Sequence, residues 1–232
     1  MGIDYQIAKF AKGSSAKFDD TLTIGRQNWW LIPNEARRLG LQWQPEYGRA
    51  TYAEPFFQEL GAGRVDSVDI VGTEHPLIIS DLSKPWFPRN EWTCVCDFGT
   101  AEHIADQAIY WANLHRAMRL YGTMLVVVPA NQMCGHGLYQ YSPEFFARMV
   151  GFESKVSVVE YGWRIKETEF VPGSRFQLRH RYPTYIFAEM VKTWEGFSMP
   201  IQDATTTHCK PVKNAGFLLG LPLVRRLQRI AQ

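Results

Sequence analysis

Two residues that can exchange protons, Glu102 and His103, follow an apolar segment that ends in an acid at Asp97. Glutamate and histidine both act as general acids and bases, and a helix N-terminus lowers the pKa of a nearby histidine. If a helix begins directly after the segment, both side chains lie on its first turn and face a ligand. We therefore predict that Glu102 and His103 are catalytic. The alternative is that Glu102 only caps the helix and His103 is a surface residue.

A second group of polar and aromatic residues lies between Asn131 and Pro143 and contains Gly135 and Gly137. Such a loop, placed directly after a strongly apolar segment, is typical of one that covers a substrate. We predict that it forms the acceptor pocket and that His136 is a third catalytic residue. The predicted substrate-binding residues are Asn131, His136, Tyr139 and Tyr141.

Cys134 and His136 in this loop are also residue types that bind metals. A zinc motif needs a second spaced pair, which the sequence lacks, so we expect no metal site. A catalytic pair of Cys134 and His136 would need a third residue to orient it, and the sequence indicates none.

Three more candidates stand at the ends of predicted strands. Gly25 permits a tight turn at which a nucleotide or carboxylate could bind, although glycine also commonly ends a strand without any binding role. Asp69 could accept the hydroxyl groups of a ribose. Asp81 could meet an adenine amino group or form an Asx-turn with the Ser-Lys-Pro that follows it.

The elements that position these residues alternate between strands and helices. Apolar runs predict strands at 21–25, 67–71, 77–80, 93–97, 124–128, 156–161 and 184–188. Helical spacing predicts helices at 33–39, 53–60, 101–120 and 143–149, and residues 42–52 are predicted to form a loop. This alternation predicts a doubly wound α/β fold with a mostly parallel sheet, which binds ligands beyond the carboxyl ends of its strands.

The composition indicates one globular domain. With 232 residues, 46% of them hydrophobic and 21% charged, the chain can bury one large core and is not a disordered protein. We divide it into an N-terminal arm at 1–20, the main domain at 21–200 and a C-terminal tail at 201–232. The tail is expected to contain a docking helix, because residues 217–230 combine an apolar run with arginines, and contact with a membrane surface is the alternative.

The net charge of +2 gives no electrostatic reason to expect a nucleic acid partner. Four cysteines without a paired CxxC, and a start without a basic and apolar leader, favour a cytoplasmic protein. No apolar run approaches the roughly 20 residues needed to cross a bilayer, so we expect no transmembrane segment.

Parts of the sequence resemble the class I S-adenosylmethionine-dependent methyltransferases. The resemblance is carried by the apolar strand that ends in Asp-Phe-Gly-Thr-Ala-Glu-His at 97–103, by the turn at 115–122 and by the strand at 124–128. Val-Gly-Phe-Glu at 150–153 is also similar to the step that precedes the family's sixth strand. The similarity extends over residues 21–188.

The resemblance implies a seven-stranded sheet with an antiparallel last strand and S-adenosylmethionine as cofactor. It implies methyl transfer to an oxygen or nitrogen of a small molecule or glycan, with His103 or His136 as base and Glu102 as the orienting group. The implied cofactor-binding residues are Gly25, Arg26, Gln27, Asp69, Asp81, Leu82, Asp97, Phe98 and Gly99.

The first turn departs from the usual family pattern. Gly25-Arg26-Gln27 replaces the glycine-rich motif and resembles a divergent group of methyltransferase-like proteins, in which Arg26 would pair with the cofactor carboxylate. The alternative is a protein with the methyltransferase fold that lacks catalysis and serves as a binding or partner subunit. A Rossmann reductase ranks last, because it needs a phosphate-binding glycine turn.

Overall fold

The computed structural model describes residues 2–43, 51–162, 165–171 and 182–200. The chain divides into the units Met1–Met199 and Pro200–Gln232, and the description below concerns the first. The predicted tail at 201–232, with its docking helix and alternative membrane contact, and most of the predicted loop at 42–52 lie outside the described residues. Among the helices that the structure describes, none is long and apolar enough to span a bilayer.

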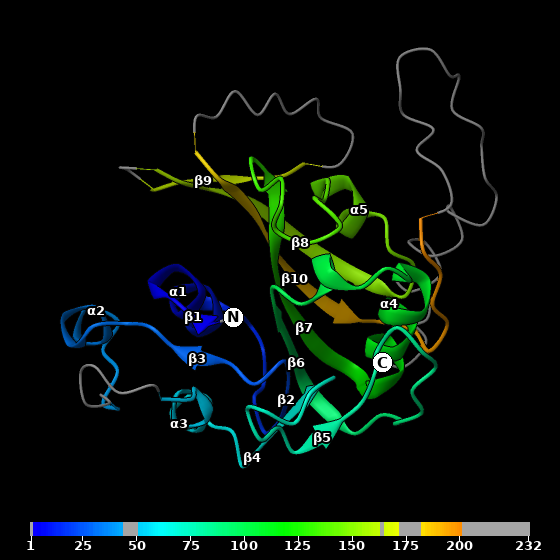
Figure 1. The fold of residues 1–232 in the computed structure, drawn as a ribbon, viewed down its shortest axis with the longest axis horizontal. Coiled ribbons are helices and arrows are strands. Elements are labelled where there is room, and N and C mark those ends of the chain that lie inside the picture. Colours follow the sequence, from blue (N-terminus) through cyan, green and yellow to red (C-terminus); the bar gives the residue numbers. More distant parts are fainter. Residues whose placement is uncertain (1, 44–50, 163–164, 172–181, 201–232) are drawn as a thin grey trace, which may run out of the picture. The chain divides into compact units, whose positions relative to one another are not determined.

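An eight-stranded sheet in the order β5-β4-β2-β6-β7-β10-β8-β9 forms the centre of this unit (Figure 1). Strands β5, β4, β2, β6 and β7 are parallel to one another, whereas β10 is antiparallel to both β7 and β8. The predicted α/β sheet with an antiparallel last strand is confirmed, and the unpredicted β9 adds an eighth strand. The bounds are β2 (Asp20–Ile24), β4 (Arg64–Asp69), β5 (Ile78–Ile79), β6 (Trp92–Phe98), β7 (Met118–Asn131), β8 (Phe152–Tyr161), β9 (Ile165–Glu169) and β10 (Thr184–Lys192).

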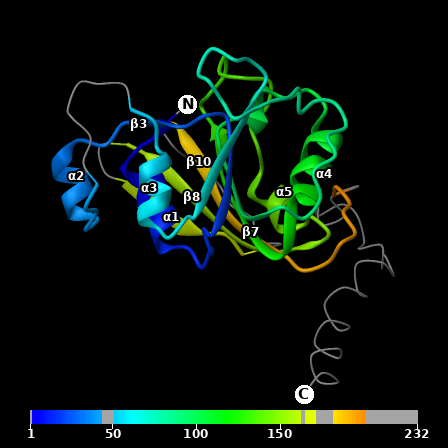
Figure 2. The ribbon, with the colours of Figure 1, turned by 90° about the horizontal axis from the view of Figure 1, so that it is seen from below.

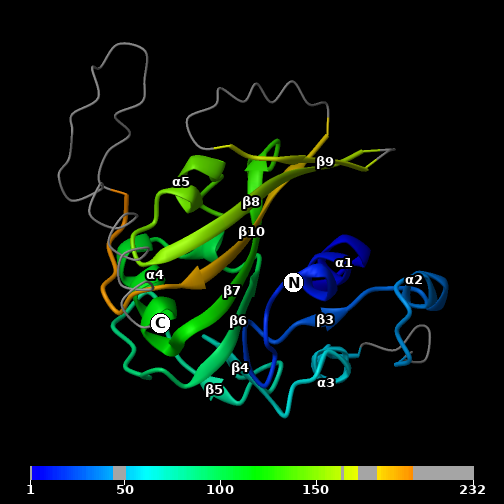
Figure 3. The same cartoon turned by 180° about the vertical axis from the view of Figure 1, so that it is seen from behind.

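Helices cover both faces of the sheet, as the doubly wound fold requires (Figures 2 and 3). Alternation along the central strands divides the core in two: Cys94 and Cys96 pack on one face, and Val95 between them packs on the other. One face carries α1 (Tyr5–Gly13), α2 (Pro33–Arg38), α3 (Glu54–Glu59) and the strand pair β1 (Gly2–Ile3) and β3 (Asn28–Trp29); the other carries α4 (Gln107–Ala117) and α5 (Pro143–Ala147).

The prediction of one helix over 101–120 is wrong. A 3₁₀ turn, η1 (Ala101–His103), comes first, α4 begins only at Gln107 with Asp106 as its N-cap, and Met118 already belongs to β7. In a continuous helix the carbonyl of Glu102 would accept from the amide four residues later. Here it accepts from Leu138 and Tyr139 of a distant loop, so a tertiary contact breaks the helix.

The N-terminal residues 2–20 pack into the same core as the sheet. Asp4 caps α1 by accepting from the amide of Ile7, and Ile7 is buried together with Ala8 and Ala11 of the same helix. A cavity of about 440 Å³ lies between α1 and strands β8, β9 and β10, and the predicted site residues do not line it. The candidate site is therefore expected at the ends of the strands and not at this cavity.

Candidate functional site

The order of the strands locates the switch point of the sheet. From β2 the chain proceeds outward to β4 and β5, and it then returns to β6 on the other side of β2 and continues to β7. Ligands of doubly wound sheets bind where this reversal leaves a crevice beyond the carboxyl ends. In this chain the reversal lies between β2 and β6, whose ends are followed by Gly25 and Gly99.

Gly25 brings three strand ends together. Its φ of +74° suits glycine, and its amide donates to Val68 of β4 at 2.7 Å. A Cβ atom on Gly25 would lie 3.4 Å from Thr100 Oγ1, 3.6 Å from Gln27 Nε2 and 3.8 Å from Asp69 Oδ2. The absent side chain thus leaves a space bordered by polar atoms, which we call the Gly25 cradle.

Gln27 is buried beside this cradle. Its Nε2 donates to the carbonyl of Ile24 at 2.9 Å, which holds the side chain against the end of β2. Its Oε1 is also buried and has no hydrogen-bond partner within the part of the chain that the structure describes. Because buried acceptors are nearly always satisfied, this oxygen calls for a donor that the described residues do not supply.

The side chain of Arg26 contacts residues outside the Gly25 cradle. Its Nε donates to Glu54 at 2.6 Å, an Nη1 hydrogen goes to the carbonyl of Glu74 at 2.9 Å, and its guanidinium lies 3.7 Å from the centre of the Tyr52 ring. An interaction with a cofactor carboxylate would have to compete with these contacts.

Asp81 forms the turn given above as the alternative to an adenine contact. Its Oδ1 accepts from the amide of Ser83 at 3.0 Å and from the Ser83 hydroxyl at 2.6 Å, while Oδ2 pairs with Lys84 at 3.0 Å. The Ser83 hydroxyl, followed by Lys84, lowers the pKa of this carboxyl. Leu82 beside it is buried, and its carbonyl accepts from Asn113 at 3.1 Å.

Asp97 organises the turn between β6 and η1. It is fully buried, and it accepts from the amide of Thr100 at 2.8 Å, from the amide of Ala101 at 3.2 Å and from the hydroxyl of Tyr110 at 2.8 Å. Burial raises its pKa to about 6, against the effect of these hydrogen bonds. With Phe98 buried and Gly99 at a φ of +97°, the segment turns sharply and presents the next residues at the strand ends.

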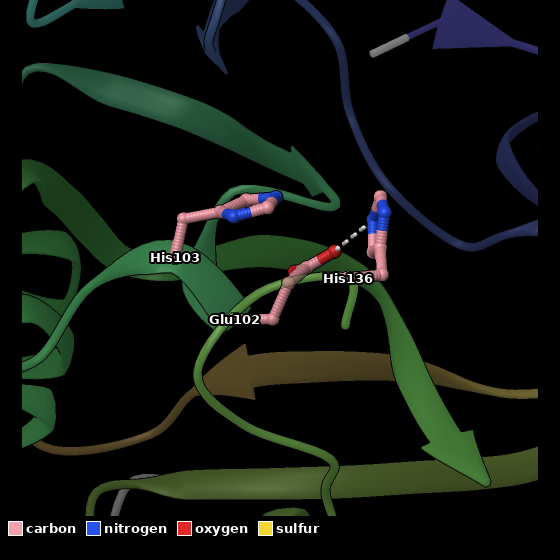
Figure 4. A group of neighbouring side chains, drawn as sticks. All are labelled: Glu102, His103 and His136. Carbon is pink, nitrogen blue, oxygen red and sulfur yellow. Dashed lines mark ion pairs between the residues drawn. The ribbon is translucent and has the colours of Figure 1, made fainter. Parts of the chain in front are cut away.

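The three predicted catalytic residues lie together at this edge (Figure 4). Glu102 Oε1 is 3.5 Å from His136 Nε2, and the His103 and His136 rings are 5.2 Å apart between centroids. One donor atom from each of the three residues lies within 4.8 Å of the other two. The structure thus unites Glu102 and His103, which follow β6, with His136, which follows β7, in what we call the Glu-His-His cluster.

The carboxylate of Glu102 is the most unusual group in the cluster. The residue is fully buried, and neither carboxylate oxygen has a hydrogen-bond partner among the described residues. Burial, followed by the charge of Asp97, raises its pKa to about 8. Burial, followed by the charge of His136, lowers the pKa of His103. The helix N-terminus predicted to have that effect on His103 is absent, because η1 is a separate turn.

The loop after β7 is fastened onto Glu102. The amides of Leu138 and Tyr139 donate to its carbonyl at 2.7 and 3.2 Å. Gly137, with a φ of +92°, permits this approach, since a Cβ on it would lie 3.0 Å from both Cγ and the carbonyl oxygen of Glu102. The side chain of His136 is 42% exposed and remains accessible to a ligand.

The other predicted substrate residues are bound to the protein itself. The hydroxyl of Tyr139 donates to the carbonyl of Ala105, and that of Tyr141 donates to Gln107, each at 2.8 Å. Asn131 Oδ1 accepts from the amide of the following residue at 2.9 Å. These three residues shape the loop beside the cluster.

Sequence reasoning missed the position of Thr100 at the switch point. Its hydroxyl donates to the carbonyl of Ile24 at 3.0 Å and so ties the end of β6 to the end of β2. Sequence reasoning also missed Tyr185 of β10, whose hydroxyl lies 3.6 Å from Met133 Sδ in the same loop. No local sequence signal marks either residue, because both act through strands that are distant along the chain.

Comparisons with known proteins give similarity in structure alone. No family model and no curated protein matches the sequence. A SAM-dependent methyltransferase of Thermotoga maritima has a TM-score of 0.44 at 11% identity, and one of Aquifex aeolicus has a TM-score of 0.44 at 10% identity. Each alignment covers 81% of this chain and 89% of the other.

A third structure is phosphoethanolamine N-methyltransferase 2 of Haemonchus contortus in complex with S-adenosyl-L-methionine. It has a TM-score of 0.38 at 16% identity, with 65% of this chain and 37% of the other covered. Because all three TM-scores lie below 0.5, the fold is assigned here from the strand order and directions of this chain, and its function from its own residues.

Proposed function

We propose that this protein binds S-adenosylmethionine at the Gly25 cradle and transfers its methyl group to an oxygen or nitrogen of a small molecule or glycan. The observation that carries the proposal is the cradle itself. A positive-φ glycine, an acidic side chain and a buried oxygen without a hydrogen-bond partner among the described residues meet at the switch point of a doubly wound sheet.

The donor and acceptor groups around the cradle fit this cofactor. Gln27 Oε1 has no donor among the described residues, and the ammonium group of the methionine moiety would supply one. Asp69 is an acceptor for the two ribose hydroxyls. Asp81 and Leu82, one strand farther out, would border the adenine, while Gly99 leaves room for close backbone approach.

The Glu-His-His cluster would receive the acceptor, because η1 connects it directly to the cradle. Bound S-adenosylmethionine supplies a methyl carbon whose bond to sulfur breaks as the acceptor atom attacks, which leaves S-adenosylhomocysteine. The residues of this chain align the acceptor, exclude water and take its proton. His136 or His103 accepts that proton, and Glu102 orients the histidine.

Cofactor binding can be tested by isothermal titration calorimetry with S-adenosylhomocysteine. Asp69→Ala should weaken affinity by about 10- to 100-fold, the effect of losing hydrogen bonds to a charged group. Asp19→Ala, an exposed acid before β2, serves as the matched control and should leave affinity unchanged. Failure of the unmodified protein to bind would overturn the proposal.

A methyl-transfer assay beside this titration separates the proposal from its rival, a partner subunit without catalysis. Binding of S-adenosylhomocysteine together with methyl transfer to a small-molecule or glycan acceptor is expected of the enzyme. Binding without transfer to any acceptor class would favour the partner subunit.

We place the reaction in the cytoplasm because, among the described residues, Cys94, Cys96 and Cys134 form no disulfide.

A further inference from the structure

We propose that Glu102, His103 and His136 form a binding site for one divalent first-row transition-metal ion of the Zn²⁺ type. The inference deepens the proposed function and rests on it only for the role of the ion, since the site itself is inferred from the cluster. Two imidazoles and one carboxylate are the donor set of catalytic zinc sites, which keep a further position open for a ligand. Two nitrogen donors out of three disfavour Mg²⁺ and Ca²⁺.

The spacing of the donors fits an ion better than a hydrogen bond. At 3.5 Å, the separation of Glu102 Oε1 and His136 Nε2 is long for an N–H···O contact. Two donors on one tetrahedral zinc ion, with bonds of about 2.0–2.2 Å, are roughly 3.4 Å apart. His103 completes the set with a donor atom within 4.8 Å of the other two, and a bound ion would draw its ring nitrogen closer.

The state of Glu102 is a second and independent observation. Both of its carboxylate oxygens are buried without a hydrogen-bond partner among the described residues, although the side chain points into the cluster (Figure 4). A buried carboxylate without hydrogen bonds is costly, and a bound cation removes that cost. His136, at 42% exposed, provides a route of entry for the ion.

The backbone around the cluster is held as a ligand site requires. Asp97 fixes the turn that carries Glu102 and His103, and the amides of Leu138 and Tyr139 clamp the His136 loop onto Glu102. The sequence criterion of a spaced pair missed the site because the three residues follow two different strands. An acceptor hydroxyl bound to the ion would lose its proton to solvent water more easily, so the ion would replace a histidine as the activating group.

The test is titration of the chelator-treated protein with Zn²⁺ by calorimetry and with Co²⁺ by visible absorption. One ion per chain is expected, with a Co²⁺ spectrum typical of coordination by nitrogen and oxygen. Glu102→Gln, which keeps the shape of the side chain, and His136→Asn should each lower affinity by at least about 10- to 100-fold. His75→Asn is the matched control, because His75 is exposed, lies outside the cluster and has a φ of 51° that asparagine tolerates.

Several outcomes would overturn the metal site. These are no binding by the unmodified protein, equal binding by Glu102→Gln, or a loss on Cys134→Ser that Glu102→Gln does not share. The absence of metal binding together with a protonated His136 would identify the cluster as a Glu–His ion pair. A protein that binds S-adenosylhomocysteine but no metal refutes this inference alone, and one that binds metal but no S-adenosylhomocysteine refutes only the proposed function.

Discussion

Two buried ionisable residues lie at opposite ends of the parallel strands. Lys192, beside the start of β7, is fully buried, yet its Nζ donates to Asn90 at 3.0 Å and to the carbonyl of Met118 at 2.9 Å, and it pairs with Glu195 at 2.8 Å. Glu102, beyond the end of β6, is equally buried and has no hydrogen-bond partner among the described residues.

This difference in hydrogen bonding distinguishes Lys192, which has a structural role, from Glu102, which has a functional one. Buried polar groups in folded proteins are nearly always satisfied, and the Lys192 end of the sheet obeys that rule. The Glu102 end departs from it at the place where the strand order reverses and ligands are expected. We infer that the contacts of Lys192 stabilise the fold and that the Glu-His-His cluster is completed by a ligand.

The largest expected effect is on activity. Glu102→Gln should lower methyl transfer by about 10²-fold while the protein stays folded, because the histidine that takes the proton loses the group that orients it. Its free energy of unfolding should be unchanged or higher, because the substitution removes no hydrogen bond among the described residues. Turnover assays and urea denaturation measure the two effects, and a large loss of stability would make Glu102 a structural residue like Lys192.

Lys192→Met should show the reverse behaviour. The variant keeps the apolar stem but leaves the carbonyl of Met118 without its donor, so the free energy of unfolding should fall by about 3 kcal/mol. Affinity for S-adenosylhomocysteine at the other end of the sheet should be retained in the folded protein. Lys17→Met, at an exposed position, is the control, and an equal effect of both substitutions in urea denaturation would remove the contrast.

His115, beside Lys192, should make the structural end sensitive to acid. Burial, followed by the charge of Lys192, lowers its pKa from 6.5 to about 4. The unfolded chain therefore binds a proton first, and the stability that neutral His115 contributes above pH 6.5 is lost as the pH falls toward 4. The loss should be about 2–3 kcal/mol relative to His115→Gln, measured as unfolding free energy against pH. Parallel pH curves for the two proteins would contradict it.

The smallest effect concerns the contact between Gly137 and Glu102. Gly137→Ala should cost about 1–2 kcal/mol, because the new Cβ adds crowding to an unfavourable φ. Gly135→Ala is a matched control with a φ of +88° and no atom within 4 Å of the added Cβ. Thermal denaturation of both variants isolates the crowding. Equal losses would show that the loop does not press on Glu102.

Much of the fold could be predicted from the sequence. Uniformly apolar runs such as residues 124–128 indicate central strands, and their alternation with helices gives the doubly wound order. Strand β9 was not predicted because Ile165–Glu169 has no alternation of apolar and polar residues. The helix at 101–120 was predicted too long because its apolar spacing continues through the break. The break is caused by amides of residues 138 and 139, which no local pattern reveals.

The candidate site could be predicted as a set of residues, and its geometry could not. Glu102, His103 and His136 were singled out by residue type and by position after strands, but their convergence depends on the pairing of β6 with β7. For Arg26, the sequence suggested contact with the cofactor carboxylate, whereas its guanidinium lies against Glu54 and Tyr52. Residues that are distant along the chain supply those partners, which is why spacing alone did not indicate them.

The most direct test of the central claim is a crystal structure of the protein with S-adenosylhomocysteine. We predict that the ligand lies across the ends of β2 and β6, with its amino group at Gln27 and its ribose at Asp69. A ligand bound instead in the cavity beside α1, or elsewhere away from the Gly25 cradle, would contradict the account.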